Sequence, residues 1–433
     1  MYMVKSLKTI YALIGMLLIP FSANSQLTLS ECQRLAWANY PLLEKYKLIR
    51  QTTSYSIQNI NRGYLPQLTV NGQASYQSDV ATLPDVLANM LESSGYNVKG
   101  LNKDQYKVGI DLNQVIWDGG NLEAQKAVID LDGKIQTVQT DVDMYAIRDR
   151  VNNLFFGILL IEDKIQLNKD LQALLLSNCQ KLENMLMNGT AMKADVDVMK
   201  AEHLKAKQQM TELASMKKSY QQMLAIFINK DLESVSFLQK PEATMPLSYE
   251  NQRPELTLFT ARMMQTDAQK KLLNAGVRPK ISLFAQGYYG YPGYDMFNDM
   301  FDHNWTLNGV IGVRLSWNIG KLYTHKNEKR KLDLARNQIE TARDVFLFNN
   351  SLQSTQEVTT IEQYRKMMME DDNIIALRTS VRQAAESKLE QGIIDVNNLL
   401  QEVTRENQAR IDRSSHEVEM LKNIYELKNT INQ

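Results

Sequence analysis

The sequence predicts an α+β fold in which four short strands accompany very long helices, arranged as two copies of one module. The first observation is a period of two, typical of a strand, in the stretches Gln67 to Gln77 and Lys280 to Tyr289. Apolar residues alternate there with polar ones, so each strand has one apolar face. Phe284 and Tyr288 are exceptions, because both fall among the polar positions.

The second observation is an internal repeat, because residues of the same type recur at one constant offset in the two halves of the chain. The matched pairs are Pro41 and Pro254, Gly63 and Gly276, Pro66 and Pro279, Gln73 and Gln286, and Tyr76 and Tyr289. Self-similarity at a fixed spacing is the signature of a repeated architecture. We therefore expect the same order of elements twice.

The third observation is the length of two helical segments. Residues 121–188 contain no proline, and residues 321–391 contain neither proline nor glycine. At a rise of about 1.5 Å per residue each would form a rod of roughly 100 Å, whereas an ordinary helix has about 11 to 12 residues. A compact globular domain does not accommodate such rods.

The first module is expected to cover residues 26–229 and to begin with a helix. Thr28 and Glu31 form a capping box, and this helix breaks near Pro41 and stops at Gly63. Pro66 fits the entry to a first strand over residues 67–77, where a missing N–H costs little.

A loop over residues 78–105, with a helical turn at 85–91, leads to a second strand over 106–117. Its alternation changes phase at Gln114, which indicates a bulge. Gly119 and Gly120 then turn the chain into the first rod. Gly189 ends that rod, and a returning helix is expected over 192–229.

Residues 230–250 form the linker, and the second module is expected over 251–433. Its first helix ends at Gly276, Pro279 precedes the third strand at 280–289, and the fourth strand covers 305–317. Gly320 turns the chain into the second rod. Gly392 ends it, and a final helix follows from about residue 395.

The N-terminus predicts export. Lys5 and Lys8 precede an apolar run from Ile10 to Phe21, and small residues then lead to Ser25. This pattern is typical of a cleaved signal peptide over residues 1–25, and the run is shorter than the roughly 20 residues that span a bilayer. Cys32 lies too far from the run for lipidation, and Cys32 and Cys179 are expected to be plain buried thiols.

Composition excludes several classes of function. Lysine plus arginine and aspartate plus glutamate number 49 each, so the chain has no basic surplus for nucleic acid. The four histidines stand at no metal-ligand spacing, and we find no phosphate-binding loop and no set of nucleophile, base and orienting residue. We therefore predict no enzyme, no cofactor and no metal site. The 21 methionines leave copper or silver efflux open, although methionine at helical spacing usually serves packing.

Four strands cannot close a barrel, and open sheet edges are not tolerated in lipid. No later segment is apolar for long enough to form a transmembrane helix, so a membrane role would fall to strands pooled from several chains. Aromatic residues near the strand ends resemble the girdles of membrane barrels: Tyr76, Trp117, Tyr289, Trp305 and Trp317. The alternative is a soluble sheet with its apolar face on a core.

These features together resemble the TolC family of outer-membrane channels over essentially the whole mature chain. The matching motifs are Asn39 with Pro41, Gly63 with Pro66 and their copies, Trp117-Asp118-Gly119-Gly120, Arg253-Pro254-Glu255-Leu256, and the two helix turns at Gly189 and Gly392. The resemblance implies a homotrimer in which twelve strands form one transmembrane β-barrel and the long helices form an α-barrel across the periplasm. It places the protein in the outer membrane of a Gram-negative bacterium, in contact with outer-membrane lipid.

The resemblance also implies a function and partners. The chain would be the passive exit duct of a tripartite efflux pump or a type I secretion system, together with a periplasmic adaptor (membrane fusion) protein and an inner-membrane transporter of RND, ABC or MFS type. The helix turns that meet the adaptor would be Gly189-Thr190-Ala191 and Gly392-Ile393-Ile394. At the second turn this chain departs from the family pattern, because Asp395 follows Gly392 by three residues instead of six.

Family channels narrow near these turns, where carboxylates face the lumen. Asp395 is the leading candidate for such a ring, with Asp195 and Asp197 as further candidates. An aspartate at a helix start also suits the helix dipole without any role in a pore. The alternative function is a periplasmic coiled-coil scaffold without a pore, and the sequence leaves the substrate open.

Overall fold

The computed structural model describes residues 27–98, 100–231 and 238–433, so the predicted signal peptide lies outside the described residues. The chain forms two compact units. Unit 1 contains the chain up to Glu44, Thr140–Pro254 and Val345–Gln433, and unit 2 contains Lys45–Gln139 and Glu255–Asp344. Each unit therefore takes segments from both halves of the sequence.

The elements follow the predicted order. The helices are α2 (Leu29–Asn39), α3 (Leu43–Asn61), α4 (Asp85–Ser93), α5 (Asn121–Met187), α6 (Lys193–Ile228), α7 (Pro254–Gly276), α8 (Met296–Phe301), α9 (Lys321–Glu390) and α10 (Val396–Ile431), and a 3₁₀ turn, η1, covers Arg62–Tyr64. The strands are β1 (Gln67–Tyr76), β2 (Asp104–Trp117), β3 (Lys280–Tyr291) and β4 (Thr306–Ser316). Both predicted rods are confirmed as single helices of 67 and 70 residues.

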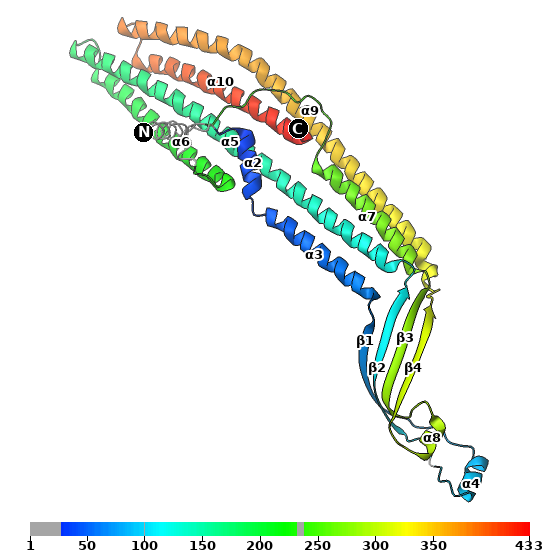
Figure 1. The fold of residues 1–433 in the computed structure, drawn as a ribbon. Coiled ribbons are helices and arrows are strands. Elements are labelled where there is room, and N and C mark those ends of the chain that lie inside the picture. The colour runs from blue at the N-terminus through cyan, green and yellow to red at the C-terminus, as the bar shows by residue number, and fades with distance from the viewer. Residues whose placement is uncertain (1–26, 99, 232–237) are drawn as a thin grey trace, which may run out of the picture. The chain divides into compact units, whose positions relative to one another are not determined.

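The four strands form one antiparallel sheet in the order β1-β2-β3-β4 (Figure 1). The central pair, β2 and β3, joins strands from the two predicted repeats, with Val108 opposite Tyr289 and Leu112 opposite Ala285. The bulge in β2 is present between Val115 and Trp117, slightly beyond the predicted position at Gln114. Because the register shifts only after Val115, this residue keeps the phase of Lys107 and Asp111 and falls on the polar face.

The two loops at one end of the sheet pack on each other. The β1–β2 loop carries α4, and the β3–β4 loop carries α8, a short helix that the sequence did not predict (Figure 1). Leu101, Tyr291 and Met300 form a small apolar cluster there. The hydroxyl of Tyr291 accepts a hydrogen bond from the backbone N–H of Asn102 at 2.9 Å and donates one to the carbonyl of Asp299 at 3.1 Å.

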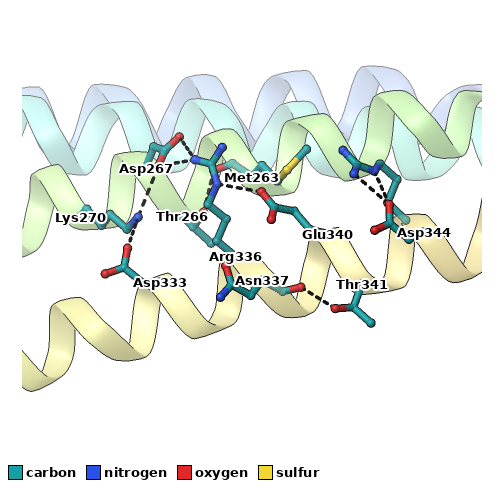
Figure 2. A network of polar contacts seen from close by, with 11 residues as sticks. Met263, Thr266, Asp267, Lys270, Asp333, Arg336, Asn337, Glu340, Thr341 and Asp344 are labelled. Carbon is teal, nitrogen blue, oxygen red and sulfur yellow. Dashed lines mark hydrogen bonds and ion pairs between the residues drawn. The ribbon is translucent and has the colours of Figure 1, made fainter.

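Within unit 2, a polar network links α7 to α9 (Figure 2). The guanidinium of Arg336 donates to both carboxylate oxygens of Asp267, at 3.0 and 2.9 Å, and to Glu340 at 3.2 Å. Lys270 contacts Asp333 at 2.6 Å. Exposed ion pairs contribute little to stability because water screens them, so the network serves more to fix the pairing of the two helices than to stabilise the unit.

Unit 1 contains the paired hairpins α5–α6 and α9–α10, with α5 from Thr140 onward and α9 from Val345 onward. Near their turns, side chains from all four helices share one apolar cluster, whose fully buried members include Leu182, Met199 and Leu399. Such burial contributes about 1.5–3 kcal/mol for each large side chain. Cys179 belongs to this cluster, and both cysteines are buried free thiols, as predicted. Burial raises the pKa of the Cys32 thiol to about 12.

Among the described residues, no helix combines the length and the apolar character needed to cross a lipid bilayer.

Candidate functional site

The sheet of unit 2 exposes a continuous apolar face. Leu68, Val70, Val108, Ile110, Leu307, Ile311, Val313 and Leu315 all lie on this face by strand register. Leu307 is 82% exposed, Val70 is 74% exposed and Ile311 is 73% exposed. At about 25 cal/mol per Å² of apolar surface, a soluble chain would gain much by covering such a face. The face therefore marks a contact with lipid or protein.

The opposite face is polar, with Gln, Asn, Ser and Thr side chains throughout β1. The two predicted exceptions, Phe284 and Tyr288, lie on this face, and each stands opposite a glycine of the neighbouring strand. A Cβ built on Gly312 would come within 2.9 Å of the Phe284 ring, and one on Gly109 within 2.7 Å of Tyr288 Cβ. Gly312 therefore leaves room for the Phe284 ring, and Gly109 leaves room for the close approach of β3 at Tyr288.

The outer edges of β1 and β4 have no strand partner within the described part of the chain. Because four strands alternate in direction, β4 of one copy and β1 of another would meet antiparallel, as every neighbouring pair in this sheet does. Neither edge carries a proline, and Arg314 is the only charged residue on the two strands. Soluble proteins usually block such edges with charges or prolines, so these edges are suited to pairing.

The predicted aromatic residues gather at the two ends of the sheet. Tyr289 and Trp305 lie at the loop end, with ring centroids 5.5 Å apart, and Tyr76 is exposed there. Trp117 and Trp317 lie at the helix end, and both are exposed. The indole N–H of Trp317 donates to the carbonyl of Val277 at 2.9 Å, which ties β4 to the segment that enters β3.

The predicted helix–strand transitions lie around the same end of the sheet. Gly63 falls in η1 and Gly276 ends α7, and Pro66 and Pro279 each directly precede a strand. Gly119 and Gly120 have φ of 71° and 83°, values that glycine adopts without strain, and Gly320 directly precedes α9. The carboxylate of Asp118 accepts hydrogen bonds from the N–H groups of Gly120 and Leu122, which caps the start of α5.

The second candidate region is the pair of helix turns in unit 1. Gly189 and Gly392 have φ of 73° and 68°, and both turns close in the same way. Thr190 N–H donates to Met185 at 2.9 Å, and Ile393 N–H donates to Lys388 at 2.9 Å, the pattern of a Schellman cap. Thr190 and Ile393 are exposed, whereas Ala191 and Ile394 pack against the apolar cluster below.

The three candidate carboxylates lie at the helix starts beyond these turns. Asp395 is the N-cap of α10, and its Oδ1 accepts from Asn398 N–H at 2.8 Å. Asp195 Oδ2 accepts from Met192 N–H at 3.0 Å at the start of α6, where Asp197 is exposed. Two of the three therefore have a capping role of their own, and both remain partly or fully accessible.

Sequence reasoning missed the polar contacts that join the hairpins near the turns. Lys181 on α5 contacts Glu390 on α9 at 2.8 Å, and this hydrogen bond raises the pKa of Lys181. Asn178 donates to Glu386 at 3.3 Å. The partners are about half the chain apart in sequence, so no local pattern could have indicated them.

A more buried network lies on α9 and α10. Glu406 is 5% exposed and accepts hydrogen bonds from Arg410, Thr379 and Arg382. Burial raises the pKa of its carboxyl, but these hydrogen bonds outweigh burial, so the pKa is lowered. In the described residues no group of three or more His, Cys, Asp or Glu side chains could hold a metal ion.

No protein-family model matches the sequence, and the search of curated proteins found no relative. Solved structures do match. The outer-membrane channel OprN superposes with a TM-score of 0.68 at 12% identity, covering 93% of this chain and 89% of the other. The outer membrane channel CmeC of Campylobacter jejuni gives 0.65 at 13% identity, with 93% and 85% covered.

The outer membrane protein VceC of Vibrio cholerae gives a TM-score of 0.65 at 11% identity, covering 93% of this chain and 95% of the other. The chain thus has the fold of these proteins over nearly its whole length. The resemblance predicted from the sequence is confirmed at the level of the fold.

Proposed function

We propose that this chain is an outer-membrane exit duct that works as a homotrimer in a Gram-negative bacterium. The observation that carries the proposal is the sheet, which combines an exposed apolar face, a polar face and two edges that no described strand pairs with. Lipid would cover the apolar face, and sister chains would pair the edges. The matched solved structures, which include channel proteins, support the same interpretation.

Strand number supports three copies. Two copies would supply eight strands, and an eight-stranded barrel is filled by its own side chains or holds at most one small ligand. Three copies would supply twelve, which leaves a wet lumen for the polar face. The strands have 10 to 14 residues, enough to cross an apolar band of about 25 Å when tilted. Tyr76, Trp117, Tyr289, Trp305 and Trp317 would then lie near the two interfaces.

The helices of unit 1 offer a second surface for sister chains. On α9, Val345, Phe348 and Leu352 are exposed at helical spacing, and so are Ile374, Leu377 and Val381. Each triplet forms an apolar stripe on one side of the helix. We propose that a neighbouring copy covers these stripes, so that the long helices close into a periplasmic tunnel.

The helix turns are the proposed contact with a periplasmic adaptor protein. Gly189, Thr190, Gly392 and Ile393 are exposed there, and Ala191 and Ile394 support the turns from below. The adaptor would link the duct to an inner-membrane transporter of RND, ABC or MFS type, in an efflux pump or a type I secretion system. Transport through the duct would be passive, and Asp395, Asp195 and Asp197 would line or flank its narrow end.

Membrane fractionation tests the proposal. The protein should stay with outer-membrane fractions through a high-salt wash, leave them only in detergent, and then migrate with the mass of three chains. Release by salt as a single chain would contradict the proposal and favour the periplasmic scaffold. Single-channel currents in planar bilayers provide the second test.

Partner contact can be tested at the turns. A photo-crosslinking residue in place of Thr190 or Ile393 should capture an adaptor of the same cell, whereas one in place of Lys103, in the β1–β2 loop, should not. Capture at position 103 alone would contradict the assignment of the turns.

A further inference from the structure

The polar face of the sheet carries more positive than negative charge. By strand register, the charged side chains on this face are Lys107, Lys280, Arg314 and Asp111. Three cations thus stand against one carboxylate in each chain. The carboxylate is itself engaged, because Asp111 Oδ2 accepts a hydrogen bond from the side chain of Asn71.

Two of these cations are held in place by the aromatic exceptions of β3. The guanidinium carbon of Arg314 lies 4.7 Å from the ring centroid of Phe284, and Lys107 Nζ lies 4.9 Å from that of Tyr288. Cation–π contacts of this kind are weakly favourable at exposed sites. They keep each charge near the sheet and reduce the freedom of its long side chain.

The two ring–cation pairs stand in line along one strand. Phe284 and Tyr288 are four residues apart on β3 and therefore on the same face, about 13 Å apart at ~3.3 Å per residue. Gln286 lies between them on that face, exposed, and opposite Asp111. The N–H donors at the edge of a stacked guanidinium remain free to bind carboxylate or phosphate.

We propose that this face is an anion-preferring wall of the conduit, so that the barrel favours negatively charged cargo. The inference rests on the proposed function, in which the polar face lines a lumen. Three copies bring three sets of ring-held cations around one pathway, and a pathway lined by one sign of charge raises the local concentration of ions of the opposite sign.

The test uses a thiol placed between the two pairs. In the membrane-embedded trimer, the Gln286→Cys variant is treated with a methanethiosulfonate reagent bearing a sulfonate and with one bearing a trimethylammonium group. Both native cysteines are buried, and the unsubstituted chain measures their background. The measured quantity is the rate of the sulfonate reagent divided by the rate of the cationic reagent. We expect this ratio to be higher for the Gln286→Cys variant than for a free thiol in solution.

Charge variants in the Gln286→Cys background show whether Lys107 and Arg314 cause the preference for the anionic reagent. Lys107→Gln combined with Arg314→Gln should lower the ratio of the two rates by about tenfold. Asp111→Asn should raise it, and Lys103→Gln, in the loop beyond the sheet, should leave it unchanged. The inference is overturned if the rate ratio matches that of a free thiol or does not respond to these variants. If neither reagent reaches the thiol in trimers, the polar face lines no wet pathway and the proposed function fails.

Discussion

The phenyl ring of Phe284 on β3 lies against the backbone of Gly312 on β4. A Cβ at position 312 would approach two ring atoms to 2.9 Å, closer than side chains in proteins approach each other. The guanidinium of Arg314 lies over the same ring, 4.7 Å from its centroid. Phe284 breaks the alternation of apolar and polar residues on β3. Its ring fits there because Gly312 on β4 has no side chain.

Gly312→Ala should therefore destabilise the protein. The added methyl group forces the Phe284 ring or the strand to move, and overpacking of this kind costs about 1–3 kcal/mol. The matched control is Gly309→Ala on the same strand, where the nearest atom, the carbonyl oxygen of Gln286, lies 3.7 Å away. Thermal unfolding in detergent, followed by circular dichroism, should show a lower midpoint for Gly312→Ala alone. Equal midpoints for the two variants would contradict the packing described here.

Gly392→Ala should strain the second helix turn without any clash. The space around its Cβ is open, so the cost comes only from the backbone at φ of 68° and amounts to roughly 1–2 kcal/mol. Asparagine adopts this conformation more easily, so Gly392→Asn should be milder. Hydrogen exchange of the Ile393 amide, which donates to Lys388, should speed up in the order Gly, Asn, Ala. Identical exchange in the two variants would contradict the strain argument.

Much of the fold could be predicted because its signals are local. The alternation in β1 and the absence of proline along α5 can each be read within a single element. The sequence therefore predicts the boundaries of these two elements to within a few residues. The short α8 was missed because six residues hold less than two full turns of periodicity. The division into two units could not be predicted either, because it depends on contacts between segments far apart in sequence.

In the candidate site, too, only features with a local sequence signal could be predicted. The glycine at each helix turn was identifiable, because a break between two long helices requires a residue that tolerates positive φ. A helix-start role for Asp395 was one of two interpretations of the sequence, whereas its hydrogen bond from the Asn398 N–H appears only in the structure. The contacts of Glu406 with Arg382 could not be predicted, because only the pairing of α9 with α10 creates them.

Glu406→Gln should destabilise unit 1 at neutral pH. The carboxylate accepts from Arg410, Thr379 and Arg382, and hydrogen bonds to charged groups contribute about 1.5–3 kcal/mol each. We expect a loss of about 2 kcal/mol at pH 7. The pKa of Glu406 is lowered in the fold, so this contribution is present above the unfolded pKa of about 4.3 and disappears as pH falls through the folded value.

The measurement for Glu406→Gln is the unfolding midpoint of variant and wild type between pH 3 and pH 8. The two should differ most near neutral pH and converge in acid. Glu390→Gln is the control, because its partner Lys181 is half-exposed and such a pair contributes about 0–1 kcal/mol. A difference that stays constant over the whole pH range would contradict the assigned role of the Glu406 charge.

Glu357 should show the opposite pH dependence. Its side chain is 7% exposed, and Oε1 accepts from Thr430 at 2.8 Å and from Gln353 at 2.9 Å, while Oε2 has no hydrogen-bond partner among the described residues. Burial raises the pKa of Glu357, and the nearby carboxylates of Glu426 and Asp149 add to the effect. The protonated form is therefore favoured inside the fold.

A raised pKa contributes stability below the unfolded value of about 4.3, and this contribution is lost as pH rises through the folded value. In Glu357→Gln the side-chain amide stays neutral at every pH, so this contribution does not change with pH. The amide oxygen still accepts the hydrogen bond from Thr430. The unfolding midpoint of Glu357→Gln relative to wild type should therefore rise from pH 4 to pH 8, whereas that of Glu406→Gln falls over the same range. If both variants moved in the same direction with pH, burial would not be what controls the Glu357 carboxyl.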